Sequence, residues 1–334
     1  MIDDVIRKAA DGGDLTAEEA NAAMTAIMSG EASPVQIAAF LVAMRMKGET
    51  VDEVTEFARV MRDHVRPVKP KSRPLVDTCG TGGDAIKTFN VSTAAAFVAA
   101  GAGVAIAKHG NRSVTSKCGS ADVLEALDIR FDLTPEEVVR CVDEIGIGFM
   151  FAPSYHPAMK HAMPVRRELG LRTVFNMLGP LTNPAGAEGQ VLGVYAPALT
   201  QLHGGVLRNL GSQRAFVVHG VGGLDEFSSF GETQVTELRD GELRSYKVTP
   251  EDVGLRRADG PEQVVGRTPQ ENAELLVSIL EGKDCPARDI VLLNAAAAIA
   301  VGGKADTLRE AVPIAVESID SGAALDSLRG LQAF

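Results

Sequence analysis

Cysteine is scarce in this chain of 334 residues. The four cysteines are Cys79, Cys118, Cys141 and Cys285, and no two of them form a CxxC pair. Scattered single cysteines are not typical of a disulfide framework or of a zinc site, both of which show characteristic spacings. We therefore expect a protein of a reducing compartment, the cytoplasm.

A membrane-spanning apolar run is also missing. The nearest candidate, residues 91–107, is interrupted by Ser92, Thr93, Gly101 and Gly103, whereas a spanning helix needs about 20 consecutive apolar residues. The opening residues, MIDDVIRKAADGGD, lack the basic and then apolar pattern of a signal peptide. We therefore expect no membrane partner.

Positive charge is in deficit, because 33 Lys and Arg stand against 44 Asp and Glu, for a formal net charge of −11. Nucleic acids and anionic membranes bind clustered positive charge, so neither partner is expected. Small anionic ligands are compatible with this negative charge, because backbone N–H groups and bound cations can hold phosphate. With 45% hydrophobic residues the chain is not disordered, and its length suits one large or two smaller domains.

Residues 1–66 are typical of a small all-helical N-terminal domain. Three Ser or Thr residues stand three positions before Glu or Gln, as in capping boxes: Thr16 with Glu19, Ser33 with Gln36, and Thr50 with Glu53. The apolar residues Ile37, Phe40, Leu41 and Met44 follow helical spacing. A connector rich in proline and basic residues follows at 66–74, and we expect it to be stiff and exposed.

Beyond the connector, short apolar strands alternate with helical segments. Strands are predicted at 75–78, 104–107, 147–152, 190–196 and 215–219, and helices at 91–100, 120–127, 135–145, 157–169 and 200–211. This alternation predicts a larger α/β domain at 74–334 with a central, largely parallel sheet. A β-hairpin is predicted at 233–249 around Asp240-Gly241.

The strongest local signal for chemistry is DTCGTGGD at 77–84, directly after the first predicted strand. Its glycines allow a tight turn that presents several N–H groups to phosphate oxygens. Gly80, Gly82 and Ala85 also match a dinucleotide fingerprint, which predicts an acidic residue about twenty positions later. That region holds no acid. The remaining alternative to phosphate binding is an ordinary glycine-rich turn.

Two further polar segments lie at the ends of predicted elements, one at the start of a helix and one after a strand. Asn90-Val-Ser-Thr93 begins a predicted helix. Such residues either cap the helix or form, with the N–H groups of the helix N-terminus, a phosphate-binding site. Residues 108–120, KHGNRSVTSKCGS, follow a strand end and supply donors for an oxyanion. The alternative for this segment is a solvated polar loop.

Adjacent carboxylates at Asp225 and Glu226 follow a strand and a glycine-rich turn. Beside two phosphate-type loops this pair favours Mg²⁺, which takes one or two carboxylates and completes its shell with water and phosphate oxygens. Arg166 lies late in a predicted helix, where it could be a surface residue or hold a substrate carboxylate. The sequence contains no nucleophile elbow, Walker motif, HExxH or kinase set.

Taken in order, six segments closely resemble the anthranilate phosphoribosyltransferase family. They are DTCGTGGD (77–84), NVST (90–93), KHGNR (108–112), GSAD (119–122), RTVFNMLGPLTNP (172–184) and GLDE (223–226). Their order, their spacing and the length of the chain fit, so the resemblance covers essentially the whole sequence. It implies a nucleoside phosphorylase/phosphoribosyltransferase-like architecture, an N-terminal domain joined by helices from about 156–185, and a homodimer.

The resemblance also implies the reaction, in which anthranilate displaces pyrophosphate from 5-phosphoribosyl-1-diphosphate (PRPP). The residues that it assigns to PRPP are Gly80, Gly83, Asp84, Thr88, Asn90, Val91, Ser92, Thr93, Lys108, His109, Gly110, Asn111, Arg112, Ser113, Val114, Thr115, Ser116 and Ser120. Two Mg²⁺ ions are implied at Ser92, Asp225 and Glu226, and anthranilate is implied at Gly80, Asn111 and Arg166. Lys108, Asp225 and Glu226 are the implied catalytic residues.

Three alternatives stay open. A pyrimidine nucleoside phosphorylase resembles this family in architecture, but its chains carry an extra C-terminal domain that we do not expect here. A paralogue could bind PRPP and use another acceptor, although Arg166 and Asn111 argue against it. A non-catalytic nucleotide sensor or nucleic-acid-binding module fits poorly with the charge of −11 and the acidic pair.

Overall fold

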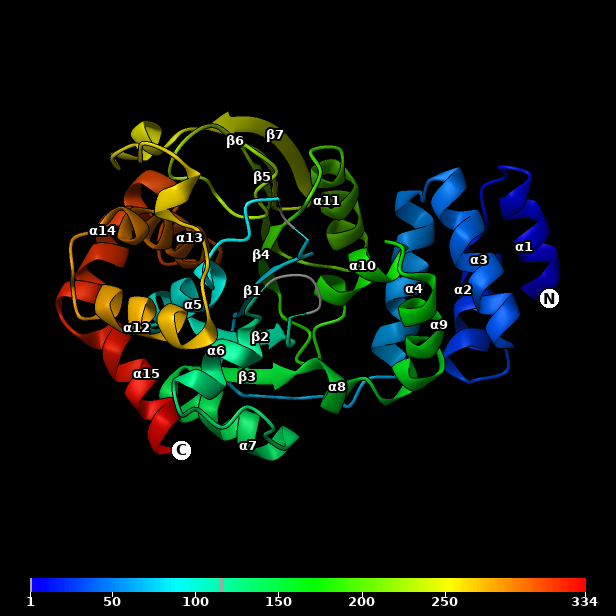
Figure 1. Ribbon diagram of the computed structural model, residues 1–334, viewed down its shortest axis with the longest axis horizontal. Helices are drawn as coiled ribbons and strands as arrows, with labels where there is room; N and C mark the ends of the chain where they lie inside the picture. Colours follow the sequence, from blue (N-terminus) through cyan, green and yellow to red (C-terminus); the bar gives the residue numbers. More distant parts are fainter. Residues whose placement is uncertain (1, 84, 114–116) are drawn as a thin grey trace.

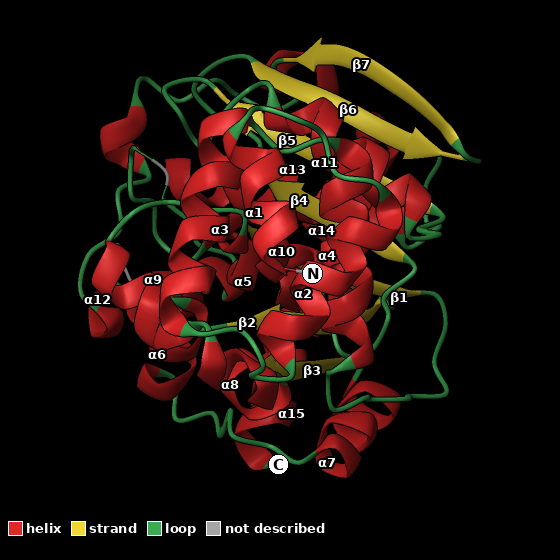
Figure 2. Cartoon of the chain, turned by 90° about the vertical axis from the view of Figure 1, so that its right-hand side faces the viewer, coloured by secondary structure: helices red, strands yellow, loops and turns green. Residues whose placement is uncertain are grey.

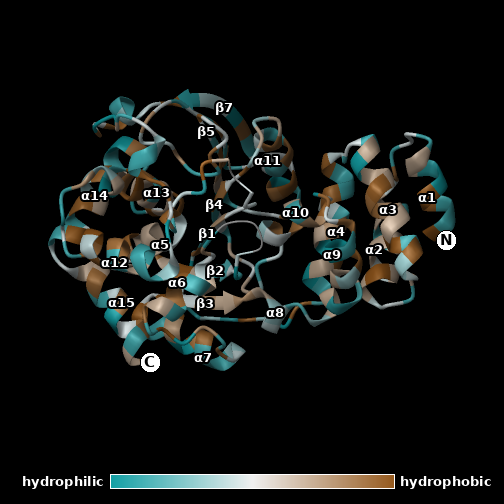
Figure 3. Ribbon diagram, viewed as in Figure 1, coloured by the Kyte–Doolittle hydropathy of each residue, from teal (hydrophilic) through white to brown (hydrophobic). Residues whose placement is uncertain are grey.

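The computed structural model describes residues 2–83, 85–113 and 117–334, so Asp84 and residues 114–116 of the implied PRPP site lie outside the described residues. Four helices come first: α1 (Ile2–Ala10), α2 (Ala17–Met28), α3 (Pro34–Lys47) and α4 (Val51–Asp63). The three predicted capping boxes at α2, α3 and α4 are confirmed, each with both reciprocal bonds. In Figure 3 these helices alternate hydrophilic and hydrophobic stretches, as amphipathic helices do.

A seven-stranded sheet forms the centre of the larger part, in the order β3-β2-β1-β4-β5-β6-β7 (Figures 1 and 2). The strands are β1 (Leu75–Gly80), β2 (Ala105–Gly110), β3 (Ile147–Phe151), β4 (Gly189–Gly193), β5 (Arg214–Gly220), β6 (Thr233–Arg239) and β7 (Glu242–Val248). The first five are parallel, and the predicted hairpin adds β6 and β7 as antiparallel strands. The strand order reverses at β1, so the carboxyl ends of β1 and β4 flank a topological switch point, where open α/β sheets bind ligands.

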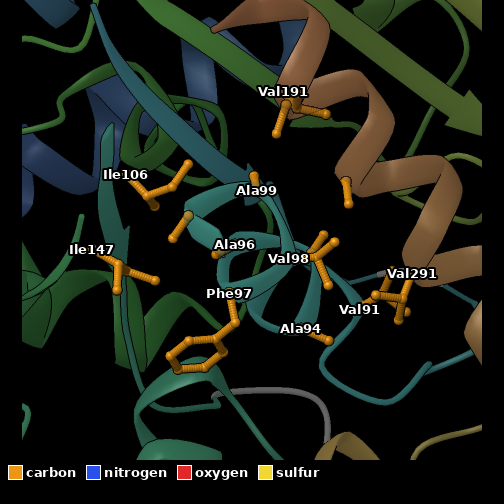
Figure 4. Packing of buried hydrophobic residues seen from close by; sticks show 14 of the residues in the cluster. Val91, Ala94, Ala96, Phe97, Val98, Ala99, Ile106, Ile147, Val191 and Val291 are labelled. Carbon is orange, nitrogen blue, oxygen red and sulfur yellow. The ribbon is translucent and has the colours of Figure 1, made fainter. Parts of the chain in front are cut away.

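Helices cover the sheet and fill the core. They are α5 (Val91–Gly101), α6 (Ser120–Ala126), α7 (Pro135–Arg140), α11 (Leu199–Asn209), α12 (Pro269–Leu280), α13 (Pro286–Val301), α14 (Leu308–Asp320) and α15 (Ala323–Ala333). Helix α5 is buried along its length, between the sheet residues Ile106 and Val191 and the α13 residue Val291 (Figure 4). Its alanine-rich sequence has no polar face, so the helix is packed on all sides. This packing fixes the position of its N-terminus.

The predicted helix at 157–169 is wrong as a single element. The chain instead forms α8 (Ala152–Tyr155), a 3₁₀ turn (Pro157–His161) and α9 (Met163–Leu169). Pro157 pushes the preceding residue out of the helical region, and Pro164 is tolerated only because it lies in the first turn of a new helix. The break turns α9 toward α3, where Val165 joins the core of the N-terminal helices.

The connector at 66–74 is only partly exposed, contrary to the prediction. Val68 is 2% exposed and belongs to the core of the larger domain. Its N–H donates to the Pro184 carbonyl at 3.0 Å, and the Arg66 N–H donates to the Tyr155 carbonyl at 2.9 Å. The connector is therefore tied to the larger domain by its backbone. Across the part of the chain that is described, no helix combines the length and apolarity needed to cross a membrane.

Candidate active site

The glycine loop leaves the carboxyl end of β1 at the switch point. Gly82 and Gly83 have φ angles of 68° and 76°, which glycine adopts at no steric cost. The Thr81 N–H donates to the Gly193 carbonyl of β4 at 2.9 Å, so the loop is tied to the neighbouring strand. Among the described residues after Gly83, the next helix is α5, which begins only at Val91; the loop differs in this from a dinucleotide-binding turn.

The acidic pair lies directly against this loop. Asp225 and Glu226, each 8% exposed, come after β5. The Gly82 N–H donates to Asp225 Oδ2 at 2.9 Å, and the Ser92 N–H of α5 donates to Glu226 Oε1 at 3.2 Å. The two carboxylates therefore connect the glycine loop with the N-terminus of α5, two segments that the sequence analysis assigned to phosphate.

Two glycines make room for the acidic pair. A Cβ on Gly193 would lie 1.5 Å from the Asp225 carbonyl oxygen, and one on Gly80 would lie 2.5 Å from Asp225 Oδ2. No side chain fits at the end of β4 without displacing the backbone at Asp225. The sequence analysis missed Gly193, because the contact joins positions far apart in the chain.

Lys108 lies inside β2, which continues to Gly110, whereas the sequence predicted a strand ending at residue 107. The side chain is almost fully buried. Its Nζ donates to the Thr78 carbonyl and to Ser92 Oγ, the latter at 3.2 Å. Burial lowers the pKa of the Lys108 ammonium from its ordinary value, and the nearby Asp77 carboxylate opposes that shift. Lys108 is thus a desolvated cation held against β1 and the start of α5.

The side chain of Arg112 pairs with carboxylates of α6. Its guanidinium contacts Asp122 at 2.8 Å and Glu125 at 2.9 Å, both on α6. These two carboxylates raise the pKa of Arg112. Asp122 also accepts the Ser113 and Gly119 N–H groups at 3.0 and 2.8 Å. In this structure the side chain of Arg112 and the N–H groups of Ser113 and Gly119 are therefore all tied to α6.

His109 faces His156 of the broken helical segment. The two Nε2 atoms are 3.1 Å apart, and both rings are buried. Burial, with the neighbouring His156, lowers the pKa of His109 to about 3, and burial lowers that of His156 to about 4. Both rings are neutral near pH 7. The backbone N–H of His109 donates to Asp77 Oδ1 at 3.1 Å.

Arg166 lies on α9, beside the N-terminal helices. Its guanidinium carbon is 5.1 Å from the centre of the Phe175 ring, and burial lowers its pKa. Among the described residues, no hydrogen bond joins Arg166 to Gly80 or Asn111. The remaining implied PRPP residues lie at the ends of these elements. Thr88 and Asn90 precede α5, Val91 to Thr93 begin it, Gly110 ends β2, Asn111 to Ser113 follow β2, and Ser120 begins α6.

Arg172 connects the helical part of the molecule with the glycine loop, a role that the sequence analysis did not assign. Its Nη2 donates to the Gly83 carbonyl at 2.5 Å, and its guanidinium carbon lies 4.4 Å from the centre of the Tyr195 ring. Arg45 of α3 donates to the Arg172 carbonyl. The contact therefore runs from α3 through Arg172 to the proposed phosphate loop.

Family models match both parts of the chain. The helical bundle domain of a glycosyl transferase family matches residues 3–65, and its a/b domain matches residues 72–325. Anthranilate phosphoribosyltransferase of Symbiobacterium thermophilum is 58% identical over 99% of this chain and 96% of its own length. That of Moorella thermoacetica is 55% identical over 100% and 98%. This chain belongs to the anthranilate phosphoribosyltransferase family.

Solved structures of the family agree with the fold. The Thermus thermophilus enzyme superposes with a TM-score of 0.93 at 47% identity, over 98% of both chains. The Saccharomyces cerevisiae enzyme in complex with PRPP and Mg superposes with a TM-score of 0.90 at 30% identity, over 99% of this chain and 97% of that one. The resemblance and the fold class inferred from the sequence are confirmed, and the chain is a transferase of this family.

The residues at this site fit the magnesium that the family implies. Asp225 and Glu226 offer carboxylate oxygens and Ser92 a hydroxyl, all hard donors of the kind that Mg²⁺ prefers. Among the described residues, no cluster of three or more His, Cys, Asp or Glu could hold a metal ion. Two carboxylates and one hydroxyl suit an ion that keeps several waters and takes oxygens from substrate phosphates.

Proposed function

We propose that this chain transfers the 5-phosphoribosyl group from PRPP to the amine of anthranilate, forming N-(5-phosphoribosyl)anthranilate and pyrophosphate. This is the second step of tryptophan synthesis from chorismate. The observation that carries the proposal is the contact of Asp225 and Glu226 with the glycine loop and with the α5 N-terminus. A polyanion that carries a phosphate and a diphosphate needs such an arrangement of N–H groups beside a cation site.

PRPP is proposed to lie across the switch point. The glycine loop, Asn90 to Thr93 and the segment from Lys108 to Ser116 would surround it, with Ser120 at the start of α6. Asp84 and residues 114–116 belong to this proposal from the sequence alone. Support comes from the N–H groups of the glycine loop and of α5, which lie at the carboxyl ends of parallel strands.

Two Mg²⁺ ions are proposed per subunit, held by Ser92, Asp225 and Glu226. When bound, they neutralise charge on the diphosphate and help it to leave. The residues of the chain add further stabilisation of the leaving group. Lys108 remains next to Ser92 and adds a fixed positive charge on the same side, which stabilises the departing diphosphate more strongly because the site is desolvated.

Anthranilate is proposed to bind through Arg166, Asn111 and Gly80. A guanidinium can hold the acceptor carboxylate with two parallel bonds, and this fixes the amine opposite the bond that breaks. The aromatic amine is neutral at pH 7 and needs no strong general base to attack the anomeric carbon. The neutral His109 and His156 agree with a mechanism that does not depend on a charged imidazole.

The domain division and the assembly complete the proposal. Domains at 1–66 and 74–334, with helices from about 156–185 added to the first, are supported by the shared core of Val165, Phe175 and the N-terminal helices. A homodimer in the cytoplasm is proposed from the family resemblance alone.

An acceptor assay tests the proposed function. The purified chain is mixed with PRPP, Mg²⁺ and anthranilate, and the loss of anthranilate fluorescence is followed with identification of the product. We expect phosphoribosylated anthranilate and pyrophosphate in equal amounts. Phosphorolysis of thymidine, or turnover of PRPP only with a different amine, would contradict the proposal.

A further inference from the structure

The C-terminal segment before α12 pairs with the loop that leads into α5. The Phe89 N–H donates to the Val264 carbonyl at 3.1 Å, and the Gly266 N–H donates to the Lys87 carbonyl at 2.8 Å. We call residues 264–266 the strap. Nothing in the proposed function uses the strap, although the loop it holds belongs to the proposed PRPP site.

The fit between strap and loop is close. Thr88 and Val265 form an antiparallel bridge, and a Cβ on Gly266 would lie 2.5 Å from the Thr88 carbonyl oxygen. Only glycine lets the two backbones approach this far. The strap therefore fixes the backbone of residues 87–89.

Asn272 of α12 extends this brace to the next residue. It is 2% exposed, and both ends of its amide are in use. Its Oδ1 accepts the Arg267 N–H at 2.8 Å, and its Nδ2 donates to Asn90 Oδ1 at 3.1 Å. One buried amide thus ties the strap end to the residue at which α5 is capped.

Asn90 occupies the N-cap of α5 but makes no capping bond with its side chain. Its Oδ1 accepts instead from Asn272 and from the Cys118 thiol, the latter at 3.2 Å. Two donors on one oxygen fix the amide plane, and the Asn90 Nδ2 group donates to the Cys118 carbonyl at 3.4 Å. A side chain that served only as a helix cap would bond to N–H groups of its own helix.

We propose that Asn272, with the strap, is a positioning residue for PRPP: it acts through Asn90 and holds the residue 87–93 segment in its binding geometry before substrate arrives. The inference rests on the proposed function, because it assumes that this segment binds PRPP. Preorganised donors avoid an ordering cost on binding. Weakening the contact of Asn272 with Asn90 should therefore raise the KM for PRPP and leave the KM for anthranilate nearly unchanged.

The test variant is Asn272→Asp. Aspartate keeps the side-chain volume and the acceptor for the Arg267 N–H, but it replaces the donor with an oxygen facing Asn90 Oδ1. We expect the KM for PRPP to rise about tenfold, with the KM for anthranilate and kcat within about twofold. The matched control is Gln270→Glu, which adds the same charge on the exposed side of α12 and should behave as wild type.

Two results would overturn the proposal while wild-type turnover stands: an unchanged KM for PRPP, or equal rises in both KM values. Absence of wild-type turnover would instead refute the proposed function. In an Asn90→Ala background, Asn272→Asp should change the KM for PRPP by less than about twofold; an undiminished effect would contradict action through Asn90.

Hydrogen exchange of the wild-type chain gives a second test that needs no folded variant. The amides of Phe89 and Gly266 should gain protection together when PRPP and Mg²⁺ are added. Protection of the loop amide without that of the strap would contradict the brace.

Discussion

At the residue scale, the proposed site depends most on the acidic pair. Asp225 and Glu226 are recognisable from sequence because two adjacent carboxylates follow a strand and a glycine-rich turn. Their contacts with Gly82 and Ser92 were not predictable, because those bonds span 143 and 134 positions of the chain. Sequence reasoning placed the pair in a site, and only the fold shows which loops it touches.

The double variant Asp225→Asn with Glu226→Gln should lose at least about a thousandfold in turnover at saturating Mg²⁺, because both proposed carboxylate ligands become neutral amides. Steady-state kinetics with anthranilate and PRPP measure it. The control is Asp240→Asn with Glu242→Gln in the exposed β6–β7 turn, which should retain activity. A near-normal kcat in the first variant would remove the metal assignment.

Arg166→Ala should raise the KM for anthranilate by about 30-fold, since a charge-assisted bidentate contact contributes roughly 2 kcal/mol. The KM for PRPP should rise far less. Arg167→Ala, the exposed neighbour on α9, is the matched control and should change neither constant appreciably. Equal rises in both KM values for Arg166→Ala would refute its proposed role.

Arg112 illustrates what residue patterns alone miss. A basic residue in a loop after a strand suggests an anion contact, and the family resemblance assigns it to PRPP. In the structure its partners Asp122 and Glu125 lie on α6, 10 and 13 positions later in the chain, so the ion pairs were hidden among ordinary surface residues. Charge in a loop predicts the loop's polarity better than the direction of one side chain.

At the scale of elements, local signals predicted helix starts well and element ends less well. The capping box at Thr16 and Glu19 forms as expected, because both bonds lie within four residues. Lys108 was placed beyond its strand, because a polar residue does not look like the interior of β2. The break near Pro157 follows from backbone chemistry, which the prediction of one helix over 157–169 did not take into account.

The ends of β1 and β4 must both be glycine for the acidic pair to fit. Gly193→Ala should lower kcat by about tenfold or more and reduce thermal stability, because overpacking against the Asp225 backbone costs about 1–3 kcal/mol. Kinetics and thermal unfolding measure both effects. Gly179→Ala, at a position with open space around its Cβ direction, is the control. Wild-type activity in Gly193→Ala would contradict the proposed packing.

The contact between β2 and the α8 region makes stability depend on pH. His156 has a pKa of about 4 in the folded chain against an ordinary 6.5, so the unfolded chain binds more protons below pH 6.5. Stability is therefore full above that value and falls by up to about 1.4 kcal/mol per pH unit between pH 6.5 and 4 for this group. Urea unfolding at several pH values measures the slope.

His156→Gln should make that slope shallower between pH 6.5 and 4, because the variant removes one group whose folded pKa is depressed. His109 contributes to the same fall, with its lowered pKa of about 3. An identical slope in wild type and His156→Gln would show that burial of this ring does not govern acid stability.

At the scale of the whole molecule, the fold resolves an apparent conflict of charge. A chain of net charge −11 is proposed to bind a small polyanion. Backbone N–H groups of two loops, the buried Lys108 and cations recruited by Asp225 and Glu226 would supply positive potential at one place only. The α/β class and the helical first part were predictable from periodicity. The meeting of α3, Arg172 and the glycine loop was not, because it depends on how distant segments pack.

Calorimetry of PRPP binding, with and without Mg²⁺, tests this placement of charge most directly. The wild-type chain should bind PRPP at least about tenfold more tightly with Mg²⁺, since the ion links the substrate to Asp225 and Glu226. The variant Asp225→Asn with Glu226→Gln should lose that gain. An equal effect of Mg²⁺ on both proteins would contradict the central claim that the acidic pair recruits the cations that hold PRPP.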